Sequence, residues 1–189
     1  MFCPFSTVGA VISMKNQPRD AWEDALIAAG GPFAGTMASC GVAVAANITD
    51  AQILYALADF GYMINLINLL PIGSMDGGRW AGALSKYVGA CGTVFGGYLA
   101  WTGAFSNPLF YLIVLAGGYE TFWRFYDPYY LPPNFYNISN TQRAILTGGY
   151  FGLIAFLLVA MAANQRRQKP PEVIAREQGG EPYWDSSSF

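Results

Sequence analysis

The feature that most constrains the fold is an apolar stretch of membrane length that runs directly into a polar, turn-forming segment. The stretch covers residues 53–70, and the segment reads Asn68-Leu-Leu-Pro-Ile-Gly-Ser-Met-Asp-Gly-Gly-Arg79. Pro71 has no backbone N–H, so it ends or kinks the preceding helix. Gly77 and Gly78 permit a tight turn because they lack a Cβ. The sequence therefore predicts a spanning helix that breaks at Pro71.

Four polar side chains lie in or next to this apolar stretch. Asn65 and Asn68 are three residues apart and so share one helix face. Asp76 follows the break, and Asp59 lies within the stretch with no basic residue nearby in the sequence. Ionisable and amide groups at membrane depth are costly, so they indicate a functional site. The alternative for Asp76 is a solvated carboxylate at the membrane edge. For Asp59 the alternatives are protonation, a polar cavity or a partner's cation.

The composition is that of an integral membrane protein. Of 189 residues, 53% are hydrophobic and only 12% are charged, whereas an average soluble chain has about 25% charged residues. The net charge of −2 offers no basic surface to nucleic acid. We therefore expect membrane lipids and other membrane subunits as partners. Three scattered cysteines make neither a disulfide framework nor a metal-binding pair.

Apolar segments long enough to cross a bilayer, which takes about 20 residues, occur five times. The first follows Asp20, which suits an N-cap, with Glu23 three residues later. Gly31-Pro32 predicts a kink in it. Gly35 and Ser39 form a small-residue face suited to close helix packing, with the positioning of a substrate backbone as the alternative role. The predicted spans cover about residues 21–48, 51–70, 85–104, 109–125 and 142–163.

Segments outside the spans complete the predicted membrane domain, residues 1–163. Residues 1–14 are apolar but too short to span, so we expect them to be membrane-associated, and residues 77–84 form a short amphipathic piece. The loop 127–141 contains three prolines and predicts an extended strap at the headgroup level. Residues 164–189 are a polar tail without periodicity. The alternative for the loop is a protein-docking surface anchored by Tyr129, Tyr130, Phe135 and Tyr136.

Three stretches carry motifs of one protease family. Asn-x-x-Pro-x-x-x-Met-Asp-Gly-Gly-Arg occupies residues 68–79, and residues 9–35 contain Trp22-Glu-Asp-Ala and Ala29-Gly-Gly-Pro-Phe-Ala-Gly35. Asn107-Pro108, followed by Gly117-Gly118-Tyr-Glu, is a weaker match. Together they resemble the site-2 proteases, the zinc intramembrane metalloproteases, over roughly residues 5 to 163. The second stretch looks like the segment that follows the metal-binding helix in bacterial members.

The resemblance places Asp76 at the position of the family's third zinc ligand. The sequence contains no histidine, and therefore no His-Glu-x-x-His motif, and Met1 stands about where the family's first catalytic helix should have ended. A catalytic zinc needs about three protein ligands and an open position for water. We therefore expect no metal, no cofactor and no proteolysis by this polypeptide alone. A vestigial motif would consist of Asn68, Pro71, Asp76, Gly77 and Gly78, with Asp76 capping N–H groups of the glycine turn.

Three hypotheses of function follow, all with an all-α membrane bundle of about five spans. In the first, the chain is a non-catalytic, site-2-protease-like accessory subunit of a complex in a bacterial inner membrane or an equivalent energy-transducing membrane. Its groove would expose Asn65, Asn68 and Asp76 to a partner helix or lipid. In the second, it is part of a working protease whose metal-binding helix comes from another chain or from upstream of Met1. In the third, it is a small channel or transporter component that uses Asp59 and Asp76 as a polar path, although no inverted repeat supports one.

Overall fold

The computed structural model describes residues 18–73, 75–103, 108–127, 129–169 and 173. Within these ranges all regular secondary structure is helical, in six helices. The all-α fold class predicted from the sequence is therefore confirmed for this part of the chain. The predicted membrane-associated segment 1–14 and most of the polar tail 164–189 lie outside the described residues.

Two long helices joined by a tight turn open the fold. Helix α1 covers Ala21–Thr49, and the Asp20 side chain accepts a hydrogen bond from the Glu23 N–H at 2.8 Å, as the capping pattern predicts. The helix continues through Pro32. It ends at Asp50, whose φ of 52° puts it in the left-handed conformation of a helix terminus. Helix α2 then covers Gln52–Asn68 and packs on α1.

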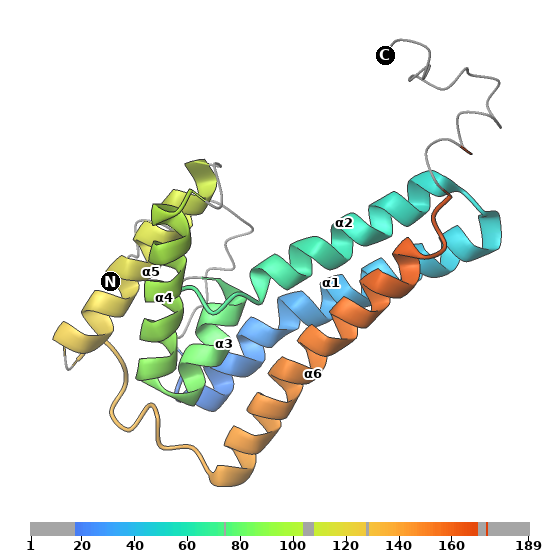
Figure 1. The fold of residues 1–189 in the computed structure, drawn as a ribbon. Coiled ribbons are helices and arrows are strands. Elements are labelled where there is room, and N and C mark those ends of the chain that lie inside the picture. The colour runs from blue at the N-terminus through green and yellow to red at the C-terminus, as the bar shows by residue number, and fades with distance from the viewer. Residues whose placement is uncertain (1–17, 74, 104–107, 128, 170–172, 174–189) are drawn as a thin grey trace.

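The remaining helices complete a bundle with α1 and α2 and add a hairpin beside it, and a short helix connects the two groups. Helix α3 covers Asp76–Leu84, α4 covers Lys86–Trp101, α5 covers Pro108–Tyr126 and α6 covers Asn140–Gln165. Helices α1, α2 and α6 lie side by side as an elongated bundle, and α4 and α5 form a hairpin beside one end of it (Figure 1). Helix α3 contacts both groups, whereas α5 packs chiefly on α4.

The core lies where α3 meets the bundle. Trp80 of α3 is buried, and its indole N–H donates to the Leu146 carbonyl of α6 at 3.1 Å. The Trp80 ring also packs edge-on against Tyr150, with centroids 5.6 Å apart. The Tyr150 hydroxyl in turn donates to the Leu69 carbonyl at the end of α2 at 2.5 Å. These contacts join α2, α3 and α6 at the end of the broken helix.

The link between α2 and α3 packs closely against glycines of α4 and α5. A Cβ at Gly92 of α4 would overlap the Pro71 carbonyl, and a Cβ at Gly117 of α5 would lie 3.0 Å from the Gly73 Cα. Gly73 itself has a φ of +29°, a conformation that side-chain-bearing residues rarely adopt. Ile72 is fully buried between these elements. The break predicted at Pro71 is thus a tightly packed crossing, with α2 ending at Asn68.

Helices cover all five predicted spans in the described residues, but they differ in length. Only α1 and α6 there are long and apolar enough to cross a membrane by length and composition, while α2 and α4 have 17 and 16 residues. Signal sequences near an N-terminus and buried core helices of soluble proteins share this composition. In α1 and α6 only 28% and 22% of the apolar window is buried inside the protein.

Candidate functional site

Asp76 is the first residue of α3, and its half-buried carboxylate faces α1. A Cβ at Gly31 of α1 would lie 2.9 Å from Asp76 Oδ2. Burial raises the pKa of the Asp76 carboxyl above its usual value, although the charge of Arg79 acts in the opposite direction. The carboxylate is therefore held in a partly dehydrated position between two helices.

The predicted glycine turn and its cap are not formed as expected. Gly77 and Gly78 lie inside α3, whose N-cap is Met75 and has no side-chain cap hydrogen bond. Both glycines are buried, and a Cβ on either would overlap the backbone at Leu69 or Ile72. Their role is close approach of two backbones rather than turn conformation, because α3 folds back directly onto the end of α2.

The two asparagines of α2 face different surroundings. Asn65 is buried, and its side-chain N–H donates to the Gly61 carbonyl of its own helix at 2.8 Å. Asn68 is half-buried at the last position of α2. Pro71 follows and is also half-buried. The structure thus places Asn65 in the α1–α2 contact and Asn68 next to the crossing.

Gly35 and Ser39 of α1 lie against α2. A Cβ at Gly35 would overlap the Asn65 side-chain amide, and a Cβ at Gly61 would overlap the Ser39 hydroxyl. The Ser39 hydroxyl donates to the Gly35 carbonyl at 2.8 Å. The small residues therefore alternate across the contact, with a glycine on each helix opposite a polar side chain of the other.

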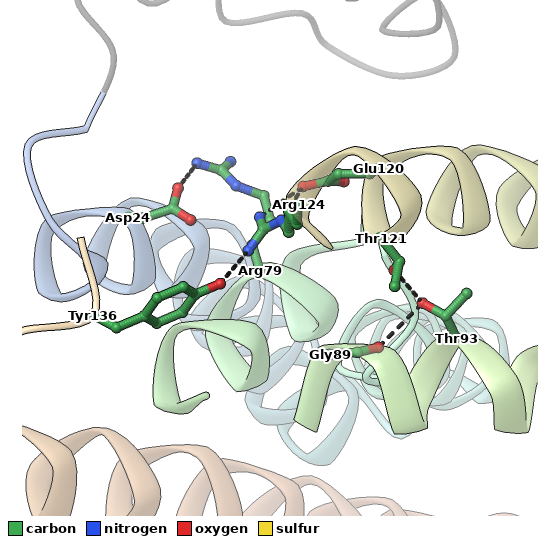
Figure 2. A network of polar contacts seen from close by, with 8 residues as sticks. All are labelled: Asp24, Arg79, Gly89, Thr93, Glu120, Thr121, Arg124 and Tyr136. Atoms are coloured by element: carbon green, nitrogen blue, oxygen red, sulfur yellow. Dashed lines mark hydrogen bonds and ion pairs between the residues drawn. The ribbon is translucent and has the colours of Figure 1, made fainter. Parts of the chain in front are cut away.

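A polar network lies where α1, α3 and α5 meet (Figure 2). Arg79 of α3 pairs with the buried Asp24 of α1. Glu120 and Arg124 form the ion pair that their spacing on one helix suggests, at 2.7 Å, and Arg124 also donates to the Tyr136 hydroxyl at 3.4 Å. Sequence reasoning missed the Arg79–Asp24 pair because the residues are 55 positions apart.

Asp59 has partners that the sequence did not identify. Asn164 near the end of α6 donates to Asp59 Oδ1 at 2.7 Å, and Gln168 donates to Oδ2 at 2.5 Å. Asn164 also donates to the Tyr55 carbonyl at 2.9 Å and is only 4% exposed. Among the described residues the carboxylate is thus held by amides of the distant α6 end, and the structure does not bring Asp59 and Asp76 into one polar cluster.

The aromatic residues of the loop 127–141 divide between surface and core. Tyr129 is 93% exposed, and Tyr130 is half-buried. The expectation of an accessible anchor is wrong for Phe135, which is 4% exposed, because its carbonyl accepts a hydrogen bond from the Ala21 N–H at 2.9 Å and draws the loop onto the start of α1. Tyr136 is half-buried beside Arg124.

The residues around Asp76 do not fit a catalytic zinc ion. Among the described residues no group of three His, Cys, Asp or Glu side chains lies close enough together to hold a metal. The free Cys40 and Cys91 lie on α1 and α4. A single carboxylate falls short of the three ligands that such a site needs, so no zinc chemistry follows from this arrangement.

Comparisons with protein-family models, curated proteins and solved structures found no match. The likeness to site-2 proteases therefore rests on the motifs in residues 9–35, 68–79 and 107–120. In the structure, glycines of α3, α4 and α5 pack against the link between α2 and α3, which lies within residues 68–79.

Proposed function

We propose that this chain is a membrane-embedded, site-2-protease-like protein that acts as a non-catalytic structural subunit of a larger membrane assembly. The observation that carries the proposal is the environment of Asp76. Its carboxylate faces a glycine of α1, and the link that precedes α3 packs by its backbone against glycines of α4 and α5. Such backbone contacts fix the relative positions of helices, which is a structural role.

Exposed apolar side chains support insertion into a membrane. Soluble monomers rarely expose large contiguous apolar surfaces, and such surfaces indicate contact with lipid or with another protein. In this chain exposed large apolar side chains occur on every helix except the short α3, and Trp101 at the end of α4 is 90% exposed. The most exposed aliphatic examples are Met37, Ile48, Ile53, Val94, Leu115 and Val159.

The first experiment tests the membrane part of the proposal. Membranes that contain the protein are washed with alkaline carbonate and then extracted with a mild detergent. We expect the protein to stay in the membrane during the wash and to enter solution only with detergent. Release by carbonate alone would contradict embedding.

The second experiment tests the absence of catalysis. The detergent-extracted protein is analysed for co-purifying chains by mass spectrometry and for bound zinc by elemental analysis. We expect stoichiometric partner chains and no zinc, and we expect the Asp76→Asn variant to leave proteolysis in these membranes unchanged. Loss of cleavage of a defined substrate in that variant would contradict a structural role.

In a second candidate function, the chain is one part of a zinc protease whose metal-binding helix comes from other polypeptide. The favouring observation is the position of Gly31, whose missing side chain leaves room for the Asp76 carboxylate between α1 and α3. Zinc at about one ion per chain, bound together with a histidine-bearing partner, would support this function. The bacterial inner membrane, or an equivalent energy-transducing membrane, stays a prediction in either case.

A further inference from the structure

A small pocket lies between α3, α4 and α5, on the side of the molecule shown in Figure 2. The pocket has room for about one water molecule. Gly73 of the link and glycines of α3 and α4 form part of its wall, so the backbone contributes to its size. The lining residues are Gly73, Gly78, Gly82, Lys86, Gly89, Ala90, Glu120, Thr121 and Arg124.

The charged groups of the pocket are two cations and one carboxylate. Arg124 donates three hydrogen bonds: Nε and Nη2 donate to the Glu120 carboxylate, and Nη1 donates to the Tyr136 hydroxyl. A guanidinium has five N–H donors, so Arg124 retains donors beyond those contacts. The Glu120 charge is matched by Arg124, and Lys86 leaves the pocket with an excess of positive charge.

Thr121 does not supply a further donor to the pocket. Its hydroxyl lies 2.9 Å from the Thr93 hydroxyl, and the Thr93 hydroxyl donates to the Gly89 carbonyl at 3.1 Å. Because a hydroxyl has one proton, Thr93 accepts and Thr121 donates in their mutual bond. The side-chain donors open to a ligand in the pocket are therefore those of Lys86 and Arg124, which suit an anion that accepts hydrogen bonds.

Lys86 lines the pocket and lies beside two aromatic rings. Its ammonium nitrogen lies 5.0 Å from the Phe125 ring centroid and 5.4 Å from that of Tyr87, and no ion pair of Lys86 occurs within the described part of the chain. Lys86 is also the first residue of α4, so the positive end of that helix dipole adds to its charge. Both rings belong to exposed residues, so an apolar surface lies beside the Lys86 ammonium group.

We propose that this pocket binds the phosphate group of an anionic phospholipid, an inference that rests on the proposed membrane function. One phosphate oxygen, similar in size to a water molecule, enters between the glycines and accepts hydrogen bonds from Arg124. The rest of the headgroup lies beside Lys86, and the acyl chains follow the exposed aromatic face of α4 and α5. Basic pockets between membrane helices are suited to such headgroups.

The test measures lipid retention by the intact detergent-extracted protein. Native mass spectrometry is recorded after addition of phosphatidylglycerol or phosphatidylcholine, with and without inorganic phosphate as a competitor. We expect phosphatidylglycerol to be retained preferentially and inorganic phosphate to displace it poorly. Equal retention of the two lipids, or full displacement by millimolar phosphate, would overturn the lipid assignment, the latter in favour of a free-phosphate site.

Two variants locate the binding. Lys86→Gln should lower phosphatidylglycerol retention about fivefold, which corresponds to about 1 kcal/mol for one basic residue at an anionic surface. Its control is Arg166→Gln, the same change of charge at the exposed far end of α6. Gly82→Ala places a methyl group 3.6 Å from Arg124 Nη1 and should also lower retention, whereas Gly97→Ala, with nothing within 4 Å, should not.

The outcomes separate this inference from the proposed function. If carbonate leaves the protein in the membrane but Lys86→Gln and Arg166→Gln retain lipid equally, the pocket is not the lipid site and the membrane proposal stands. If carbonate releases the protein, both proposals fail. Should Lys86→Gln prove unfolded by size-exclusion chromatography, the comparison of Gly82→Ala with Gly97→Ala decides the question alone.

Discussion

At the scale of single residues, several polar side chains inside this apolar chain are held by partners from distant parts of the sequence. Asn164 of α6 holds Asp59 of α2, and the Tyr150 hydroxyl reaches the Leu69 carbonyl. A buried polar group without a hydrogen bond costs about 1–3 kcal/mol, so each such pair favours one arrangement of the helices. Asp76 differs, because burial disfavours its charged form.

The pKa of Asp76 leads to a prediction about pH. Because burial raises the pKa in the folded state, the fold binds this proton more tightly than the unfolded chain does. The stability from Asp76 is therefore fully present below the pKa of the unfolded carboxyl, about 3.9, and is lost as the pH rises through the folded-state pKa. Asp76→Asn should remove this loss.

Thermal melting in detergent at pH 4 and pH 7 measures the effect. We expect the stability of Asp76→Asn relative to the wild type to be higher at pH 7 than at pH 4. The change should be small because the carboxyl is only half-buried. Asp127→Asn, in the exposed turn after α5, is the control for a general effect of charge. A wild type that becomes more stable, relative to Asp76→Asn, as the pH rises would contradict the prediction.

At the scale of helices, glycines decide which faces come together. Gly35 and Gly61 bring α1 and α2 into contact, while Gly92 and Gly117 admit the link after α2 to the α4–α5 hairpin. Gly30, Gly97 and Gly118 lie on the same helices with nothing within 4 Å of an added Cβ. The helices therefore contain both packing glycines and glycines that only weaken the helix.

Gly35→Ala and Gly30→Ala should have opposite effects. The methyl group at Gly35 would overlap the buried Asn65 amide, and overpacking of this kind costs about 1–3 kcal/mol. Gly30→Ala meets open space and should stabilise α1 by about 0.5–1 kcal/mol, the difference in helix propensity. Equilibrium unfolding in mixed micelles compares the stabilities of the two variants. Equal effects would contradict close packing of α1 and α2 at Gly35.

The end of α6 should depend on Asn164 more than on its neighbour. Asn164→Ala removes the hydrogen bonds to Asp59 and to the Tyr55 carbonyl and should cost about 1–3 kcal/mol. Gln165→Ala changes an exposed side chain and should cost less than about 0.5 kcal/mol. Hydrogen exchange of α6 amides gives a local measure, and unchanged protection in Asn164→Ala would sink the prediction.

At the scale of the whole molecule, charged groups gather near the two ends of the helical bundle. Arg79, Arg124 and Arg143 lie at the end where α1 and α6 begin, and Asp50, Arg167 and Lys169 lie at the other. Helix α6 is about 39 Å long at 1.5 Å per residue, which exceeds the roughly 30 Å of a bilayer core. The arrangement is consistent with the proposal that helices of this chain cross a membrane between two polar ends.

Labelling of single cysteines tests this arrangement. In a background with the native cysteines replaced by serine, Thr141→Cys and Arg166→Cys place a thiol at exposed positions near opposite ends of α6. A membrane-impermeant thiol reagent should label one variant in intact cells or vesicles and the other only after permeabilisation. Labelling of both from the same side would show that α6 does not cross.

The helical segments and several local contacts could be predicted from the sequence alone. Asp20 with Glu23 predicts the start of α1, and Pro71 predicts the end of α2, because capping and proline act over a few residues. The spacing of Glu120 and Arg124 on one helix face likewise suggests their ion pair. These features depend on short-range geometry that the sequence itself specifies.

Only the tertiary structure decided how the apolar helices use their polar and glycine residues. Nothing in the sequence indicated that Asn164 would hold Asp59, that Phe135 would be buried, or that Gly77 and Gly78 would serve close packing instead of a turn. Apolar periodicity predicts that a helix forms and not which helix it meets, because many faces of similar hydrophobicity can pair. The choice among them depends on steric fit at glycines and on hydrogen bonds between residues far apart in the chain.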